Sequence, residues 1–392
     1  MLSPAEPPAD ARIVKFHAPE IVFGPGSLAE SGFAAARLGA RRPFVMTDPG
    51  IIAAGWVEEL VQYLRSAGLS PVVCSEVTPN PKDHEVAAAY ESYLEGDADV
   101  IIGIGGGSVM DAAKGVAILS GNGGSVLDYA GVDRVGKPIP PTMMIPSTAG
   151  TGADVSQFCI VTDTARLTKV TIMGRALVPD ISITDPRLLT TMPAWLTAAS
   201  GLDALTHGIE AYVSLAHNPL TDQHALTAVR LVGEYLEATL ERPLDLPARL
   251  QMAHASLEAG LAFSNAILGA THAMSHQVGG LLDAPHGVVN AVLLPHVVRY
   301  NADASPERFV PVAAALGIAV EGVPADVVAG VLAQRIRDLA DRVGVPAGLR
   351  DLGVHPGDLA RMAGTTLDDA CLTTNPRPAD AADLQALFLA AL

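Results

Sequence analysis

The first half of the chain alternates short apolar runs with segments whose apolar residues recur every three or four positions. Apolar runs without polar alternation, such as "ADVIIGIG", predict strands that are buried on both faces, as in a parallel sheet covered by helices. Segments such as "GWVEELVQYLRSAG", "HEVAAAYESYLEG" and "SVMDAAKGVAIL" predict the helices between them. The other predicted strands are "RPFVMTD", "SPVVCSEV", "PTMMIPST" and "DISITDP", with a hairpin expected in "VSQFCIVTDTARLTKVTI". The pattern therefore predicts an α/β domain with a parallel sheet.

The pattern changes near Met192, after which Ala, Leu, Glu and His recur at helical spacing and β-branched runs are rare. The helix breakers in "DPRLLTTMP" place the transition between Pro186 and Pro193. We therefore expect an α/β domain over residues 1–189 and an all-helical domain over residues 190–392.

Composition narrows the classes of function. The 392 residues are 49% hydrophobic with a formal net charge of −17, which argues against nucleic acid or an anionic membrane as a partner, because both attract positive charge. Pro or Gly interrupts the apolar runs before they reach membrane-spanning length. Cys74, Cys159 and Cys371 are far apart, which indicates free thiols in a reducing compartment. The acidic, proline-rich start "MLSPAEPPADARIVKF" is unlike a signal peptide, so we expect a cytoplasmic protein.

A glycine-rich loop follows the strand "ADVIIGIG". In "IIGIGGGSVMDAAK" the glycines separate a strand from the start of a helix, where backbone N–H groups can bind a phosphate. The spacing does not match the dinucleotide fingerprint, because Ser108 stands where its last Gly would be. It does not match a Walker A loop either, because no Gly-Lys-Ser/Thr sequence follows. A purely structural alternative is a tight turn in which Ser108 caps the helix and Asp111 completes a capping box.

Two further features favour a dinucleotide at this edge of the sheet. Asp48 ends the strand "RPFVMTD", where an acidic residue often binds a ribose hydroxyl. An Asp before Pro-Gly is also a common turn residue, so this alternative stays open. The loop "PSTAGTGADVS" follows another strand, and we expect its Ser147, Thr148 and Thr151 around a cofactor.

The helical half contains two pairs of polar residues at helical spacing. Asp203 and His207 in "GLDALTHGIE", and His272 and His276 in "THAMSHQVGG", each lie four residues apart and so share a helix face. A single buried histidine is more often a hydrogen-bonded core residue than a ligand. With His286 close behind, however, the pairs supply a carboxylate and several imidazoles, a donor set suited to Zn²⁺ or Fe²⁺.

The chain resembles the iron-containing (group III) alcohol dehydrogenases along essentially its whole length. The resemblance rests on "GIGGGSVMDAAK", "PSTAGTGADVS", "SGLDALTHGIEAYVS", "THAMSHQVGG", "PHGVVNAVLLPHV" and "NPRP". It implies a Rossmann-like domain and a helical domain with the active site between them, the fold that dehydroquinate synthase also has. It further implies a homodimer or higher homo-oligomer, and Fe²⁺, with Zn²⁺ as the alternative metal. We expect NAD(H) rather than NADP(H), because Asp48 would repel the extra phosphate.

The resemblance also assigns roles to individual residues. It places the metal ligands on Asp203, His207, His272 and His286. It places the active-site histidine, which is not a ligand, on His276, and the pyrophosphate loop on Gly106, Gly107 and Ser108. The positions that line the cofactor cleft are Asp48, Asn80, Thr148, Thr151 and Lys169. We expect Phe158 and Phe263 in the substrate pocket, and Phe158 replaces a residue that is often smaller or polar in the family.

We therefore expect reversible hydride transfer between NAD and a small primary alcohol or its aldehyde, with the metal as Lewis acid and His276 relaying the proton. The main alternative is a metal- and NAD-dependent cyclase or lyase of the dehydroquinate synthase type. Such an enzyme would need several Lys and Arg residues around a phosphate-bearing substrate, and the segments nearest the predicted metal are poor in them. A non-catalytic metal- or nucleotide-binding protein is the third hypothesis.

Overall fold

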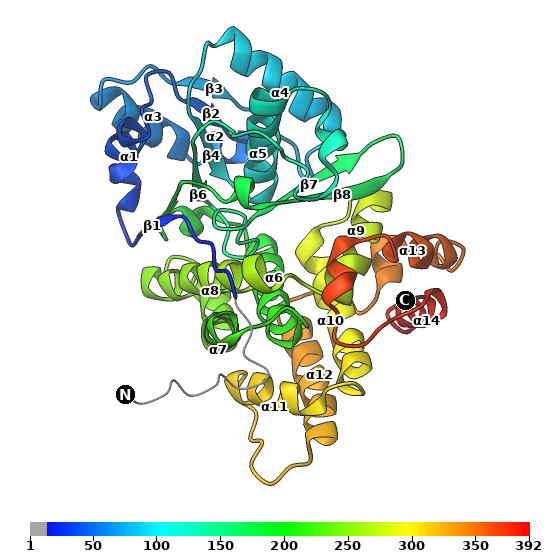
Figure 1. Ribbon diagram of the computed structural model, residues 1–392. Helices are drawn as coiled ribbons and strands as arrows, with labels where there is room; N and C mark the ends of the chain where they lie inside the picture. The colour runs from blue at the N-terminus through cyan, green and yellow to red at the C-terminus, as the bar shows by residue number, and fades with distance from the viewer. Residues whose placement is uncertain (1–13) are drawn as a thin grey trace, which may run out of the picture.

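The computed structural model describes residues 14–392, and the proline-rich segment 1–13 lies outside the described residues. Figure 1 shows an α/β unit in the upper part of the view and a helical unit below it. The predicted fold class, a Rossmann-like α/β domain followed by an all-helical domain, is confirmed.

The larger sheet is parallel throughout, in the order β1-β9-β6-β4-β2-β3. Its central strands β2 (Phe44–Met46), β4 (Ile101–Gly105) and β6 (Thr142–Pro146) are buried at every residue, as their unbroken apolar runs predict. β9 (Ile181–Thr184) pairs with β6 and with the edge strand β1 (Glu20–Phe23), and β3 (Val72–Cys74) forms the other edge. β1 was not predicted, because a four-residue edge strand is too short to show a periodicity.

A smaller sheet contains β5 (Gly131–Val132), β8 (Thr168–Met173) and β7 (Phe158–Asp163). β7 and β8 are antiparallel with Phe158 opposite Met173, so the predicted hairpin is confirmed. β8 lies directly against helix α9 (Ala270–Leu282), since a Cβ added to Gly280 would come within 2.6 Å of Thr168 Cα. The hairpin therefore joins the sheet unit to the helical unit.

The helices cover the sheet and build the second unit (Figure 1). Among the described residues, only helices and 3₁₀ turns follow β9, as the helical spacing predicts; the division at residue 189/190 stays a prediction. The helices of the first unit are α1 (Ser31–Arg37), α2 (Pro49–Ala53), α3 (Trp56–Ser66), α4 (Asp83–Glu95) and α5 (Gly107–Asn122). Those of the second are α6 (Ala194–Val213), α7 (Pro219–Glu241), α8 (Leu246–Ala266), α9, α10 (His286–Ala302), α11 (Pro306–Ala315), α12 (Ala325–Arg342), α13 (Leu359–Thr366) and α14 (Ala381–Ala390).

α6 is the central helix of the second unit, and every residue from Thr197 to Val213 is buried. Small residues allow this, because a Cβ at Gly201 would lie 2.4 Å from Leu236 Cδ1 on α7. The polar side chains of α6 therefore lie inside the protein and need internal partners.

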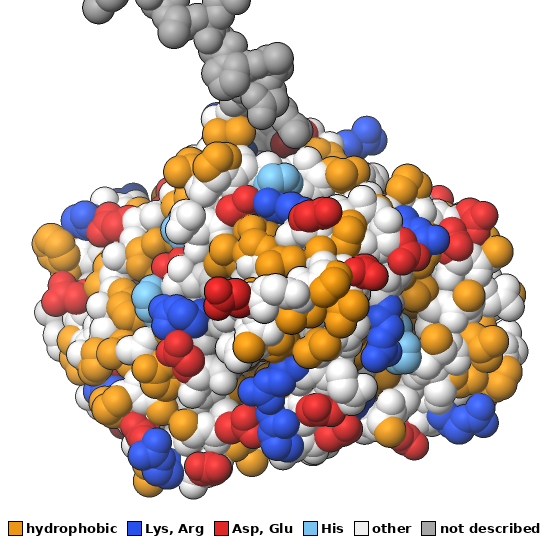
Figure 2. Space-filling model, turned by 90° about the horizontal axis from the view of Figure 1, so that it is seen from below, with side chains coloured by type: hydrophobic (Ala, Val, Ile, Leu, Met, Phe, Trp, Pro, Cys, Tyr) orange, Lys and Arg blue, Asp and Glu red, His pale blue; other side chains and the backbone are white. Residues whose placement is uncertain are grey.

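On the surface, acidic and basic side chains are interspersed with apolar ones over the face shown in Figure 2. No helix within residues 14–392 is long and apolar enough to span a membrane.

Candidate metal and cofactor site

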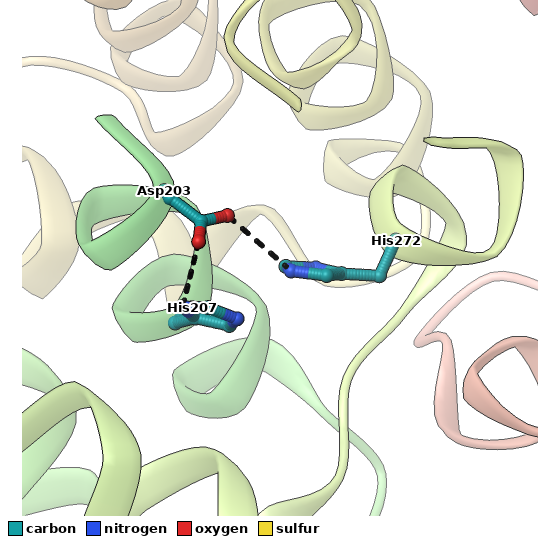
Figure 3. A group of neighbouring side chains, drawn as sticks. All are labelled: Asp203, His207 and His272. Atoms are coloured by element: carbon teal, nitrogen blue, oxygen red, sulfur yellow. Dashed lines mark ion pairs between the residues drawn. The ribbon is translucent and has the colours of Figure 1, made fainter. Parts of the chain in front are cut away.

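Buried side chains from α6 and α9 form the centre of the site (Figure 3). Asp203, His207 and His272 each offer a ligand atom within 4.8 Å of the others. Asp203 Oδ1 lies 3.9 Å from Nε2 of His272 and 3.9 Å from Nε2 of His286 at the start of α10, and Asp203 Oδ2 lies 4.0 Å from His207 Nδ1. The structure thus brings the four predicted metal ligands together from three helices.

The Nδ1 atom of each of these histidines already has a partner outside the cluster. A carbonyl or carboxylate oxygen can only accept, so Nδ1 of His207 and of His272 carries the hydrogen and Nε2 carries the lone pair, the arrangement in which imidazoles bind metals. Burial lowers the pKa of both His272 and His286 well below the ordinary value, so both rings stay neutral. The Nδ1 partners are the carbonyl oxygen of Gly150 for His207 (3.1 Å), the carboxylate of Glu210 for His272 (2.6 Å) and the hydroxyl of Ser275 for His286 (3.0 Å).

Asn290, one turn after His286 on α10, lies among the ligand atoms. Its Nδ2 is 2.7 Å from Asp203 Oδ1 and 3.1 Å from Nε2 of both His272 and His286. Its Oδ1 is buried and has no hydrogen-bond partner among the described residues. One carboxylate and three imidazoles converge on one place, and the amide of Asn290 is the group that lies among them. This donor set fits Fe²⁺ or Zn²⁺.

The glycine loop has a shape that suits a phosphate. α5 begins at Gly107 with Gly106 as the N-cap, and no side chain within residues 14–392 caps it. Ser108 Oγ instead accepts the backbone N–H of Asn80 (3.0 Å), so the capping-box alternative is wrong. A Cβ at Gly107 would lie 2.8 Å from Thr151 Cγ2, so only glycine fits this contact between the two loops. Uncapped N–H groups at a helix N-terminus favour an anion.

Asp48 lies beside the same loop and also has a local role. Its Oδ1 accepts the N–H groups of Gly50 (2.8 Å) and Ile51 (3.1 Å), which makes it the N-cap of α2. Its Oδ2 faces the glycine loop, 3.3 Å from where a Cβ of Gly105 would lie. Nearby, Thr148 Oγ1 is buried without a hydrogen-bond partner in the described part of the chain. These features fit a nucleotide: one carboxylate oxygen and one hydroxyl remain for a ligand.

A single cavity of about 730 Å³, including its open mouth, joins the glycine loop to the histidine cluster. Among the described residues, four predicted ones are not part of its lining: Asp48, Gly106, Ser147 and Thr148. Two of these four lie beside each other, because a Cβ at Gly106 would lie 3.3 Å from Thr148. The predicted residues that do line it are Asn80, Gly107, Ser108, Thr151, Phe158, Lys169, Phe263 and His276, together with the four predicted ligands.

The two predicted pocket residues form an apolar wall of the cavity. The rings of Phe158 and Phe263 lie 5.6 Å apart, and Phe263 stacks on His207 at 4.4 Å. Lys169 lines the same cavity. Burial lowers the pKa of its amine to about 8, although the negative charge of Asp111 acts in the opposite direction and raises it. Phe158 and Phe263 therefore make one side of the cavity apolar, whereas Lys169 is a polar group of its lining.

Asn290 and Asp369 contact predicted site residues but were not themselves predicted from the sequence. Asn290 lies four residues after His286, so the helical spacing used for the other pairs could have identified it. Asp369, whose Oδ2 lies 2.8 Å from His276 Nδ1, is 93 residues away from that histidine, and no spacing connects them.

A glycine-rich loop on a parallel sheet and a carboxylate–imidazole cluster in a helical unit border one cavity, and this combination fits an enzyme that uses a metal and a nucleotide. The comparison with protein families agrees. The iron-containing alcohol dehydrogenase family matches residues 18–186, and the C-terminal domain of the Fe-containing alcohol dehydrogenase family matches residues 197–392. The chain belongs to the iron-containing alcohol dehydrogenase family, and the predicted enzyme class, an alcohol dehydrogenase among the oxidoreductases, is confirmed.

Individual relatives match over nearly their full length. A 1,3-propanediol dehydrogenase of Citrobacter freundii is 41% identical over 368 residues, which cover 93% of this chain and 95% of the relative. An NAD-dependent methanol dehydrogenase of Bacillus methanolicus is 36% identical and covers 96% of this chain and 99% of its own. The crystal structure of a 1,3-propanediol oxidoreductase superimposes with a TM-score of 0.94 at 40% identity, covering 97% of this chain and all of that one (100%).

Proposed function

We propose that this protein is an NAD(H)-dependent alcohol dehydrogenase and aldehyde reductase for small primary alcohols, with Fe²⁺, or Zn²⁺ as the alternative, held by Asp203, His207, His272 and His286. The observation that carries the proposal is the single cavity that joins the uncapped glycine loop to these four side chains. The relatives named after 1,3-propanediol and NAD-dependent methanol oxidation support the substrate class and the cofactor.

The bound groups supply the difficult chemistry: the metal would act as a Lewis acid toward the substrate oxygen, and NAD would take or give the hydride. The protein's own residues do the rest. The rings of Phe158 and Phe263 exclude water and limit the size of the substrate. His276 lines the cavity but is not one of the proposed ligands, so its ring can hold or move a proton.

Asp48 supports NAD(H) over NADP(H). Its free Oδ2 can accept a ribose hydroxyl, whereas the extra phosphate of NADP would meet a carboxylate. Gly106, Gly107 and Ser108 would bind the pyrophosphate, with Asn80, Ser147, Thr148, Thr151 and Lys169 around the cofactor.

The dehydroquinate synthase-type alternative fits the cavity less well. Among the described residues, the lining contains one lysine, Lys169, and no arginine. A phosphate-bearing, carboxylated substrate would need several cations. The uncharged aromatic wall favours a simple alcohol.

The test is a panel of primary alcohols with NAD⁺, and of the matching aldehydes with NADH, using enzyme of measured metal content. We expect net NADH formation from short alcohols and diols, loss of turnover after chelation, and recovery with Fe²⁺ or Zn²⁺, while NAD binding persists. Phosphate release without net NADH formation would favour the cyclase, and NAD binding without turnover would indicate a binding protein. Full activity of metal-free enzyme would contradict the proposed metal role.

Two further expectations belong to this proposal. A homodimer or larger homo-oligomer is tested by light scattering of the purified protein. A cytoplasmic location is supported by Cys74, Cys159 and Cys371, which form no disulfide in the described structure, and it is tested by fractionation of the source cells.

A further inference from the structure

His276 has a partner that the proposed function leaves unexplained. Asp369 lies at the N-cap of a 3₁₀ turn, Ala370–Thr374, near the C-terminal end of the chain. Its Oδ2 lies 2.8 Å from His276 Nδ1, and the two side chains are only 4% and 3% exposed. A buried carboxylate that contacts an imidazole directly restricts both the position and the tautomer of the ring.

The two oxygens of Asp369 have separate partners. Oδ1 accepts the backbone N–H of Cys371 (2.9 Å), which caps the turn and holds the carboxylate in place. Oδ2 can only accept, so His276 Nδ1 carries the hydrogen and Nε2 carries the lone pair. Because the ring lines the cavity, Nε2 is the nitrogen left for a hydroxyl bound there. The ring also stacks on His286, with centroids 5.5 Å apart and planes 16° apart, which fixes its plane.

A second metal ion is a weaker explanation of this cluster. His276, Asp369 and Cys371 offer atoms within 4.8 Å of one another. However, a contact of 2.8 Å between Nδ1 and Oδ2 is a direct hydrogen bond, which leaves no room for an ion between them. Burial also raises the pKa of the Cys371 thiol well above its ordinary value, which disfavours the thiolate form that a metal would need.

We propose that Asp369 is a positioning residue for proton transfer: it holds His276 with the Nε2 lone pair toward the cavity. The proposal rests on the proposed function of His276. During alcohol oxidation the substrate O–H bond breaks, directly or through a cofactor hydroxyl, and its proton forms a bond to Nε2 while the electron pair stays on oxygen. Bound NAD⁺ would take the hydride, and His276 then passes the proton to water. Asp369 acts through His276 and touches neither substrate nor cofactor.

The test is a double-mutant cycle of Asp369→Asn and His276→Ala in the full-length, iron-loaded enzyme, with propane-1,3-diol and NAD⁺ as substrates. Asn keeps an oxygen for the Cys371 N–H but has no second acceptor for Nδ1. We expect Asp369→Asn to lower kcat by about 10–100-fold, the range for residues that orient a catalytic group, with KM, iron content and NAD affinity within about 3-fold. In the His276→Ala background the same change should alter kcat by less than about 2-fold, because Asp369 then has no ring to position. Asp368→Asn, at the exposed neighbouring position, is the matched control and should match the wild type.

Each outcome decides the question. If Asp369→Asn lowers kcat equally in the wild-type and His276→Ala backgrounds, Asp369 has a structural role. If the Asp369→Asn variant keeps wild-type kcat, Asp369 has no role in the reaction. Either result overturns the proposal. If His276→Ala keeps full activity, the proposed role of His276 fails as well, and so the two failures are distinguishable. The cycle is repeated with Asp369→Ser, whose hydroxyl can still accept the Cys371 N–H. If neither variant folds, the carboxylate serves the fold rather than the histidine, and the proposal is wrong.

Discussion

Replacing Glu210 with Gln tests how the metal site is built. Glu210 lies on α6, one turn after His207, and both of its oxygens face the start of α9. Oε1 accepts the backbone N–H of Thr271 (2.6 Å). Oε2 accepts the N–H groups of Gly269 (3.2 Å) and His272 (3.4 Å) and contacts His272 Nδ1 (2.6 Å). The side chain therefore caps α9, whose N-cap glycine offers no side-chain oxygen, and orients a proposed ligand.

The magnitude follows from these contacts. Gln has nearly the same shape, but one oxygen becomes an NH₂ group that faces N–H donors. If the NH₂ replaces Oε1, the Thr271 N–H loses its acceptor; if it replaces Oε2, three donors lose theirs. At least one buried donor is left unpaired, which costs about 1–3 kcal/mol, and the lost charge at the helix N-terminus adds about 0.3–1 kcal/mol. We expect the free energy of unfolding to fall by about 1–4 kcal/mol, and the metal affinity to fall by about 10–100-fold because His272 is less firmly oriented.

The assay has two readouts. Competition with a fluorescent chelator under anaerobic conditions gives the Fe²⁺ affinity, and urea unfolding gives the stability. Glu234→Gln on the exposed face of α7 is the control and should change neither quantity by much, because its ion pair with Arg230 is exposed. A lower free energy of unfolding with unchanged metal affinity would show that Glu210 caps α9 but does not orient His272. If neither quantity changed, the reasoning from these contacts would be refuted.

Three other predictions use the same logic. Phe158→Ala should increase kcat/KM for longer alcohols relative to ethanol, because the 5%-exposed ring fills the cavity wall, and an unchanged chain-length profile would contradict this. The wild type should prefer NADH over NADPH by about 30–150-fold in kcat/KM with one aldehyde, or about 2–3 kcal/mol, and Asp48→Gly should make this preference smaller. A wild type that prefers NADPH would refute the prediction. Burial raises the pKa of Glu258, but hydrogen bonds from His224 and His254 outweigh it and lower the pKa to about 2. Glu258→Gln should therefore lower the free energy of unfolding, measured in urea at pH 7, by about 1–3 kcal/mol. The difference from the wild type should disappear as the pH falls from about 4.5 toward 2, and a pH-independent difference would argue against the ionised carboxylate.

The fold class and the two polar pairs in the helical half were accessible from the sequence because both depend on short-range periodicity. Which of these residues bind the metal was implied by the family resemblance. A strand that is buried on both faces must be apolar at every position, so "ADVIIGIG" and "PTMMIPST" could be assigned to a parallel sheet without knowledge of their neighbours. Likewise, residues four apart on a helix must share a face, and so Asp203 with His207, and His272 with His276, could be paired in advance.

Only the tertiary structure decided what each polar group does. Ser108 and Asp48 were each open to two interpretations, and the hydrogen bonds show Ser108 bound to the Asn80 backbone and Asp48 capping α2 with one oxygen still free. The Nδ1 partners of the histidines come from other elements, and Asp369 is 93 residues away from His276. Local spacing cannot encode these contacts, because they depend on how the chain returns through the helical unit. The sequence by itself thus determined the elements and the donor types, whereas packing determined which nitrogen, oxygen and N–H group meet in the site.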